Sequence, residues 1–537
     1  MQDIRSADNG DNTYTNPILY CDYSDPDAIR VGDDFYMTAS SFTDTPGLPL
    51  LHSRDLVNWE VINYCIDNVP EESYSKPRYG CGVWAPSIRY HEGVYYVVFP
   101  MPDEGIYVTK TRDPYGKWSE PVNIFPGAGR IDPCPFWDDD GRCYLVYGVA
   151  KSRIGFNNKL FVCELSPDCM SVIGESREVY DGEPLGHRTT EGPKLYKRMG
   201  YYYIFAPAGG VKPGYQLAMR AKDIYGPYDV RVVLKQGGTD INGPHQGAWV
   251  DTASGEDWFI HFRDVYAAGR ITYLEPMKWV NDWPVIGEEI LDEKGDPTGC
   301  GQPVTTYRKP ETDTSHKEVA VKVPETSDTF TSGKLNSAWQ WNCNHKENMT
   351  YAPKDAKGIA LRCAKREDDI YANEAGLLMQ KWPAPEFDIE TELDVTGLKE
   401  GDRAGFVCFG LSFAGAVITK KGKHFVLEST LGYIDFSKAG PVYGMKKKEE
   451  QSIKDPSSVR FKLSIRRDGV KPGGELEYAP KKKGTFYIQN KGKWDKLFEF
   501  EPLQGRWTGA KTGVFADSAT PENGGSLVMR SFLYDFL

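Results

Sequence analysis

The sequence lacks a long hydrophobic run, an excess of basic residues and helical heptads. Without an apolar stretch of about 20 residues, a membrane-spanning helix is not expected. The formal net charge is −12, which argues against nucleic acid or an anionic membrane as a partner, because both are negatively charged. Uncharged substrates such as sugars remain open.

A disulfide framework and a zinc site are also not expected. The chain has 11 cysteines, an odd number, and no CxxC pair. Cys143, Cys163 and Cys408 lie in strand-like runs such as "RCYLVYG" and "FVCFG". The pattern therefore predicts buried thiols.

What the sequence does contain is a repeat. At 537 residues the chain is too long for one ordinary core, and five similar units begin near residues 25, 84, 132, 191 and 244. Each unit has a short strand, a turn rich in Gly and Asp, an aromatic strand and a third strand. A spacing of about 50–60 residues for every four strands is typical of propeller blades. The alternative is a β-sandwich with accidental internal similarity; we expect a five-bladed β-propeller.

The register of the repeats groups five distant residues at one end of the propeller axis. These unit starts are Asp25, Trp84, Asp132, Glu191 and His245. Like charges close together raise the pKa of at least one carboxyl group. Hydrolysis of a glycosidic bond needs two carboxyl groups with different pKa values, one protonated and one ionised. The competing interpretation is that the acids cap turns, since Asp before Pro is a common turn signal.

Several motifs together resemble glycoside hydrolase family 43. They include "SDPDAIRVGDDFYMTASSF", "GVWAPSIRYHEGVYYVVF", "RIDPCPFWDDDG", "TEGPKLYK", "NGPHQGAWV" and "GRITYLEPMKW". The resemblance implies a five-bladed propeller and hydrolysis with inversion at the anomeric carbon. It implies that Asp25 is the general base, Glu191 the general acid, and Asp132 the group that modulates the pKa of the acid and orients the sugar.

The same resemblance implies four substrate-binding residues. Arg270 would hold sugar hydroxyls, Phe42 and Trp84 would form aromatic walls, and His245 would lie near the axis. No cofactor is expected and no residue is assigned to a metal. A structural Ca²⁺ ion is left open, but "DDDG" at 138–141 is better explained as a hairpin turn.

The retaining, fructan-active enzymes with five blades are the rival family. Their hallmarks include an Arg-Asp-Pro and a Glu-Cys pair, whereas this chain has "RIDP" and "TEGP". These departures favour family 43.

The chain changes character after the propeller. We expect the propeller over residues 14–308, a polar linker over 309–325 and an antiparallel β-sandwich over 326–537. The last part resembles the concanavalin-like domain behind many family 43 xylosidases. Its expected role is to pack against the propeller and shape the pocket rim; the alternative is a carbohydrate-binding module.

The function that follows is an inverting, exo-acting glycoside hydrolase. It would release terminal α-L-arabinofuranosyl or β-D-xylosyl residues from plant oligo- or polysaccharides, with a slight preference for arabinofuranose. The alternatives are mainly β-xylosidase activity, or a non-catalytic glycan-binding protein. The polar start "MQDIRSADNGDNTY" leaves two locations open: periplasmic or secreted if a signal peptide was removed, and otherwise cytoplasmic. Oligomeric state is not predicted.

Overall fold

The computed structural model describes residues 3–312, 319–354, 357–366, 376–435, 442–467 and 481–537. Strands dominate this part of the chain, and its helical turns are short. These turns are η1 (Glu72–Ser75), α1 (Lys151–Ile154), η2 (Glu183–Leu185) and η3 (Pro521–Asn523).

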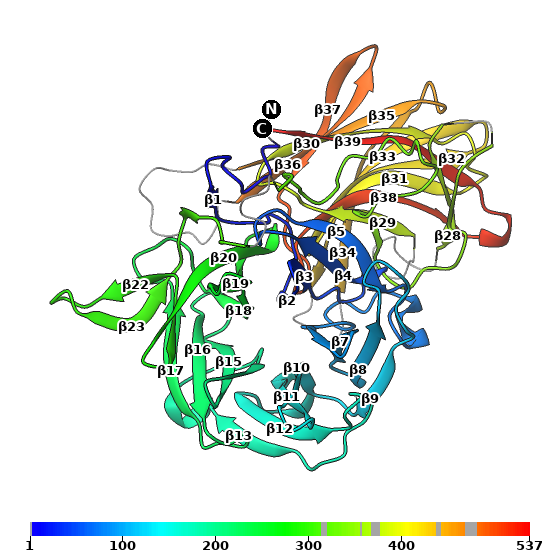
Figure 1. Cartoon of the computed structure of the whole chain (residues 1–537). Helices are drawn as coiled ribbons and strands as arrows, with labels where there is room; N and C mark the ends of the chain where they lie inside the picture. The colour runs from blue at the N-terminus through cyan, green and yellow to red at the C-terminus, as the bar shows by residue number, and fades with distance from the viewer. Residues whose placement is uncertain (1–2, 313–318, 355–356, 367–375, 436–441, 468–480) are drawn as a thin grey trace.

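Five blades form a ring around a central axis (Figure 1), and the four core strands of each blade are antiparallel. Blades 1 and 2 are β2 (Asp27–Val31), β3 (Asp34–Thr38), β4 (Gly47–Ser53) and β5 (Glu60–Ile66), then β6 (Ser87–His91), β7 (Val94–Met101), β8 (Gly105–Thr111) and β9 (Val122–Pro126). Blade 3 is β10 (Arg130–Trp137), β11 (Cys143–Val149), β12 (Lys159–Leu165) and β13 (Arg177–Asp181).

Blade 4 is larger than the others. It contains β14 (Lys194–Arg198), β15 (Tyr201–Ala208), β16 (Tyr215–Ala221) and β17 (Asp229–Lys235), extended by β23 (Pro297–Gln302) and β22 (Glu288–Leu291). Blade 5 is β18 (His245–Asp251), β19 (Asp257–Val265), β20 (Gly269–Val280) and β21 (Trp283–Ile286). The five-bladed propeller expected from the repeat is therefore confirmed.

Tight turns connect the first two strands of the blades. Glu92 and Gly93, between β6 and β7, both have positive φ, and so do Met199 and Gly200, between β14 and β15. Two positive φ angles in a two-residue loop match the twist of a hairpin. The glycine supplies one of them without steric cost.

The hydrophobic cores lie between neighbouring blades. Tyr36 and Leu50 of blade 1, for example, pack with Val97 of blade 2. Comparable clusters fill the interfaces between blades 2 and 3, blades 3 and 4, and blades 4 and 5. Burying a side chain of this size contributes ~1.5–3 kcal/mol. The blades are thus stabilised by their neighbours around the ring.

The N-terminal segment helps to close the ring. β1 (Thr13–Thr15) pairs with β24 (Thr306–Arg308), and the Tyr14 hydroxyl donates a hydrogen bond to the Leu274 carbonyl (2.8 Å). Tyr14 also packs in the core shared by blades 1 and 5. The two ends of the propeller are therefore held together.

A β-sandwich follows the propeller. One sheet has the order β25 (Gln340–Trp341), β29 (Leu377–Lys381), β38 (Lys511–Ser518), β31 (Arg403–Phe409), β32 (Ser412–Lys421), β33 (His424–Asp435) and β34 (Val442–Ser452), with β28 (Ala364–Lys365) against β38. The other has the order β26 (Thr350–Tyr351), β27 (Ile359–Arg362), β39 (Ser526–Phe536), β30 (Phe387–Asp394), β35 (Val459–Arg467), β36 (Lys482–Asn490) and β37 (Lys493–Phe500). A core that includes Phe406, Phe486 and Phe532 fills the sandwich.

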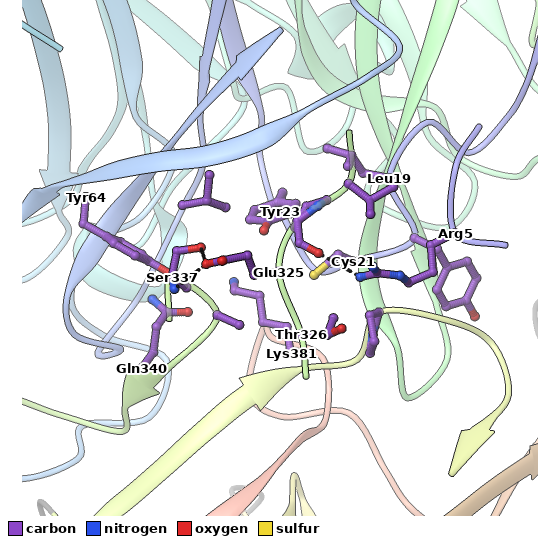
Figure 2. Close-up of a pocket in the computed structure, with 16 residues that line it drawn as sticks. Arg5, Leu19, Cys21, Tyr23, Tyr64, Glu325, Thr326, Ser337, Gln340 and Lys381 are labelled. Carbon is purple, nitrogen blue, oxygen red and sulfur yellow. Dashed lines mark hydrogen bonds between the residues drawn. The ribbon is translucent and has the colours of Figure 1, made fainter. Parts of the chain in front are cut away.

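The sandwich packs against the propeller next to blade 1 (Figure 1). Figure 2 shows residues of both domains around a narrow cavity of about 30 Å³, which is room for about one or two water molecules. At this interface Tyr64 donates to the Ser337 carbonyl and the Lys381 ammonium donates to the Asp22 carbonyl, each at 2.7 Å. A buried ion pair between Asp44 and Lys511 also joins the domains.

Two expectations from composition agree with the described residues. The cysteines are thiols, and ten of the eleven are buried. No helix in the described ranges is long and apolar enough to cross a membrane.

Candidate active site

The repeated unit starts meet at one end of the axis. Asp25, Trp84 and Glu191 each come two or three residues before the innermost strand of their blade, while Asp132 is the third residue of β10. A cavity of about 110 Å³ lies between them. It is lined by Asp25, Phe42, Trp84, Ala85, Ile131, Asp132, Glu191, Gln246, Arg270 and Trp507. Three carboxyl groups from three blades therefore face one cavity.

Unusual backbone geometry directs the acids into this cavity. Asp25 and Asp132 both have a positive φ, 54° and 56°, in the left-handed region that Asp tolerates better than most residues. Such strain costs about 1–3 kcal/mol and persists where the surroundings enforce it. In β10 the ladder also shifts between Ile131 and Cys134, a bulge that re-aims the side chain.

The fifth blade has the same bulge, one residue later than the repeat suggested. The ladder of β18 shifts between His245 and Gly247, and Gln246 at the bulge has φ 41°. Gln246 is therefore the counterpart of Asp132, and it lines the cavity. The sequence reasoning placed His245 at this position and missed Gln246.

Asp25 is surrounded by donors. Ser24 Oγ and Ser40 Oγ donate to its Oδ2 at 2.8 and 2.6 Å, and Arg270 Nη1 donates to its Oδ1 at 2.9 Å. Hydrogen bonds from neutral donors and a guanidinium favour the ionised form of a carboxyl group. Asp25 is thus equipped to act as a carboxylate.

Asp132 and Glu191 are carboxyl groups close enough for the charge of one to change the pKa of the other. Burial raises the pKa of Glu191 to about 8, and the nearby charge of Asp132 adds to the rise. Burial is also the largest cause that raises the pKa of Asp132, to about 7. The Gly192 N–H donates to Asp132 Oδ2 at 2.7 Å. Because that donor favours ionised Asp132, the proton that the pair holds near neutral pH belongs on Glu191.

His245 lies next to Glu191 but is not among the residues that line the cavity. Its Nε2 is 3.4 Å from Glu191 Oε1, and its side chain is 1% exposed. Burial, with the charge of Arg270, lowers the pKa of His245 to about 3, so the ring is neutral. Neither ring nitrogen has a hydrogen-bond partner among the described residues.

In the described ranges, no group of three or more His, Cys, Asp or Glu side chains is placed to hold a metal ion. In the "DDDG" hairpin, Asp138 binds the ammonium of Lys197 and the hydroxyl of Tyr202. These contacts connect the hairpin turn of blade 3 to blade 4, as expected for a structural turn.

Aromatic side chains form the remaining walls. Phe42 and Trp84 come from the propeller, and the Arg153 guanidinium lies 5.0 Å from the Trp84 ring centroid. Trp507 comes from the sandwich, in the loop between β37 and β38, and is 44% exposed. The Arg270 guanidinium lies 6.0 Å from its ring centroid. The sequence reasoning expected the second domain at the pocket rim but did not identify Trp507.

Asp22 joins this loop to the propeller side of the site. Its Oδ1 accepts the N–H of Arg270 and its Oδ2 accepts the N–H of Gly509, both at 2.7 Å. Gly269 is packed so closely that an added Cβ would lie 2.5 Å from Asp22 Oδ1. One buried carboxylate therefore fixes the backbone of Arg270 and the loop that carries Trp507.

Known proteins share both domains with this chain. The family model for glycosyl hydrolases family 43 matches residues 14–284, and the model for the beta xylosidase C-terminal concanavalin A-like domain matches residues 327–534. A putative beta-xylosidase of Xylanibacter ruminicola is 38% identical over 421 residues, covering 78% of this chain and 74% of the relative. A beta-xylosidase of Formosa agariphila is 30% identical, covering 99% and 91%.

Other relatives differ in the activity that they are named for. A non-reducing end alpha-L-arabinofuranosidase of Bacteroides ovatus is 32% identical over 308 residues, covering 52% of this chain and 54% of the relative. A solved structure described as a bifunctional GH43-CE protein of Bacteroides eggerthii superposes with a TM-score of 0.77 at 28% identity, covering 97% of this chain and 63% of that one. The chain belongs to glycosyl hydrolase family 43, as its motifs indicated, and is a glycosidase.

Proposed function

We propose that the protein is an inverting, exo-acting glycosidase that removes terminal pentosyl residues, chiefly β-D-xylosyl. The observation that carries the proposal is that Asp25, Asp132 and Glu191 line one cavity. Their environments differ, since Asp25 is held by ionic and hydroxyl donors while Glu191 has a raised pKa. Such a difference suits a carboxylate base and a carboxylic acid.

The roles follow from these environments. Asp25 takes a proton from a water molecule, whose oxygen attacks the anomeric carbon. Glu191 gives its proton to the glycosidic oxygen as the bond to the anomeric carbon breaks. Asp132 stays ionised and thereby keeps Glu191 protonated before the reaction. Asp25 then releases its proton to solvent and Glu191 regains one, so the enzyme returns to its starting state.

The cavity supports exo action. Its volume of about 110 Å³ is well below the roughly 300–1,000 Å³ of pockets for drug-sized ligands. Phe42, Trp84 and Trp507 offer ring surface, and Arg270 offers a charged donor. This combination suits one sugar ring at the end of a chain.

The choice of sugar draws on the relatives. The sequence alone gave a slight preference for arabinofuranose. Two relatives that match over most of both chains are named beta-xylosidases, one of them putative, and we therefore place β-D-xylose first. α-L-Arabinofuranose is the second candidate, supported by the Bacteroides ovatus relative.

The test is pentose release from nitrophenyl β-D-xylopyranoside and α-L-arabinofuranoside, and from xylobiose. We expect the highest kcat/KM on the xylosides. NMR of the first product should show α-xylose, because inversion of a β-linkage gives the α-anomer. β-Xylose as the first product would contradict inversion. Sugar binding without any hydrolysis would favour a glycan-binding protein instead.

A further inference from the structure

A buried charged cluster lies next to the cavity, on the first strands of three blades. Asp27 of β2 and Lys194 of β14 have fully buried side chains, and Arg89 of β6 is 13% exposed. Arg89 Nη1 pairs with Asp27 Oδ2 at 2.6 Å, and the Ile88 N–H donates to the same oxygen. This first pair is electrically neutral.

Lys194 adds a positive charge that the pair does not balance. Its Nζ lies 3.8 Å from Asp27 Oδ1, beyond hydrogen-bond distance, and that oxygen has no hydrogen-bond partner among the described residues. The cluster of Asp27, Arg89 and Lys194 therefore carries one net positive charge. Burying an unbalanced charge is costly unless opposite charge lies close by.

The opposite charge is in the cavity. The titratable groups in and beside the cavity are Asp22 and Asp25 before β2, Asp132 of β10, Glu191 before β14, His245 of β18, Asp264 of β19 and Arg270 of β20. Arg270 pairs with Asp25 and His245 is neutral. The charges of Asp22 and Asp264 also act on Arg270. Asp132 has no ion pair among the described residues, and the charge of Lys194 acts to lower its pKa.

Hydrogen bonds also connect Lys194 to the turns of the site. Its Nζ donates to the Pro86 carbonyl at 2.8 Å and to Ser87 Oγ at 2.7 Å. Ser87 Oγ in turn donates to the Pro133 carbonyl at 2.6 Å. Pro133 follows Asp132 directly, and Pro86 is two residues after Trp84. The ammonium group therefore holds peptide groups beside two cavity residues.

We propose that Lys194 is a positioning residue for the glycosidase reaction: its buried ammonium group keeps Asp132 ionised, so that the proton of the pair stays on Glu191. This inference rests on the proposed function of the site. Lys194 is not among the residues that line the cavity. It acts through the charge of its ammonium group on Asp132, and its hydrogen bonds hold the turns beside the site.

The test is the pH dependence of kcat/KM in the variant Lys194→Met, which removes the charge and keeps most of the length. Loss of a nearby positive charge should raise the pKa values of the carboxyl groups, by on the order of 1 unit. Both limbs of the pH profile should therefore move to higher pH. The matched control is Ser87→Ala, which removes the hydrogen bond from Lys194 and the one to the Pro133 carbonyl but keeps the charge. Its limbs should not move.

A second variant works in the opposite direction. Asp27→Asn removes a negative charge from the same cluster and should move both limbs to lower pH. Asp27→Asn also tests the proposed role of Lys194 if the Lys194→Met variant does not fold. Unmoved limbs in a folded Lys194→Met or Asp27→Asn variant, or equal shifts in Ser87→Ala, would overturn the proposal. A wild-type protein that hydrolyses no pentoside would instead overturn the proposed function.

Discussion

The cavity has two kinds of wall. Most of it comes from the propeller, where repeated positions in successive blades supply Asp25, Asp132 and Glu191. One side comes from the sandwich, through Trp507 on a single loop. The propeller wall carries the carboxyl groups that we propose exchange protons, while the sandwich wall adds only ring surface. The comparison suggests that chemistry and substrate fit are assigned to different domains, so changes in each wall should have different kinetic signatures.

The largest effect is expected from Asp25→Ala. Without a base to activate water, kcat/KM should fall by roughly 10²–10⁴-fold on every substrate. The measurement is steady-state kinetics on nitrophenyl and natural glycosides, with thermal unfolding as a check on folding. Activity within tenfold of wild type would show that another group activates water.

Glu191→Ala should depend on the leaving group. Xylobiose needs a proton on its leaving oxygen, whereas nitrophenolate leaves readily without one. We expect a loss of kcat/KM roughly 10²-fold greater on xylobiose than on the nitrophenyl xyloside. An equal loss on both substrates would contradict the assignment of Glu191 as the acid.

The pH profile reports the same group in the wild-type protein. Glu191 must be protonated to act, and its pKa is raised to about 8. The kcat/KM should therefore be retained at neutral pH and fall as the pH rises through about 8, by about tenfold per unit above it. A fall that begins near pH 5, close to the ordinary pKa of Glu, would contradict a protonated Glu191.

A smaller effect is expected from the sandwich wall. Trp507→Ala removes ring surface at the cavity and should cost about 1–2 kcal/mol of substrate binding, or roughly 5–30-fold in KM. The kcat should change less, because the carboxyl groups stay in place. A fall in kcat equal to that of Asp25→Ala would break the division between the two walls.

Tyr64→Phe is the matched control for this variant. It removes an interdomain hydrogen bond, to the Ser337 carbonyl, away from the residues that line the site cavity. The free energy of unfolding should fall by about 0.5–1.5 kcal/mol, with KM unchanged. A rise in KM like that of Trp507→Ala would mean that general loosening of the interface, rather than the ring of Trp507, explains the effect.

The sequence predicts the propeller wall because equivalent blades place their first residues at equivalent points. It could therefore bring Asp25, Asp132 and Glu191 together from three blades. The same logic gave His245 in place of Gln246, because a bulge shifts the register by one residue and leaves no mark in a strand pattern. Trp507 and Asp22 lie outside the repeat. Their contacts depend on how two domains pack, and the spacing of residues along the chain does not encode that.

Asp22 has a consequence for how such proteins can diversify. One carboxylate serves both the backbone of Arg270 and the loop of the second domain. A graft that exchanges the sandwich for that of a relative would replace one of its two partners. Chimeras should therefore hold this loop differently even when Asp25, Asp132 and Glu191 are retained, and those that restore a glycine amide opposite Asp22 should hold it most like the original protein.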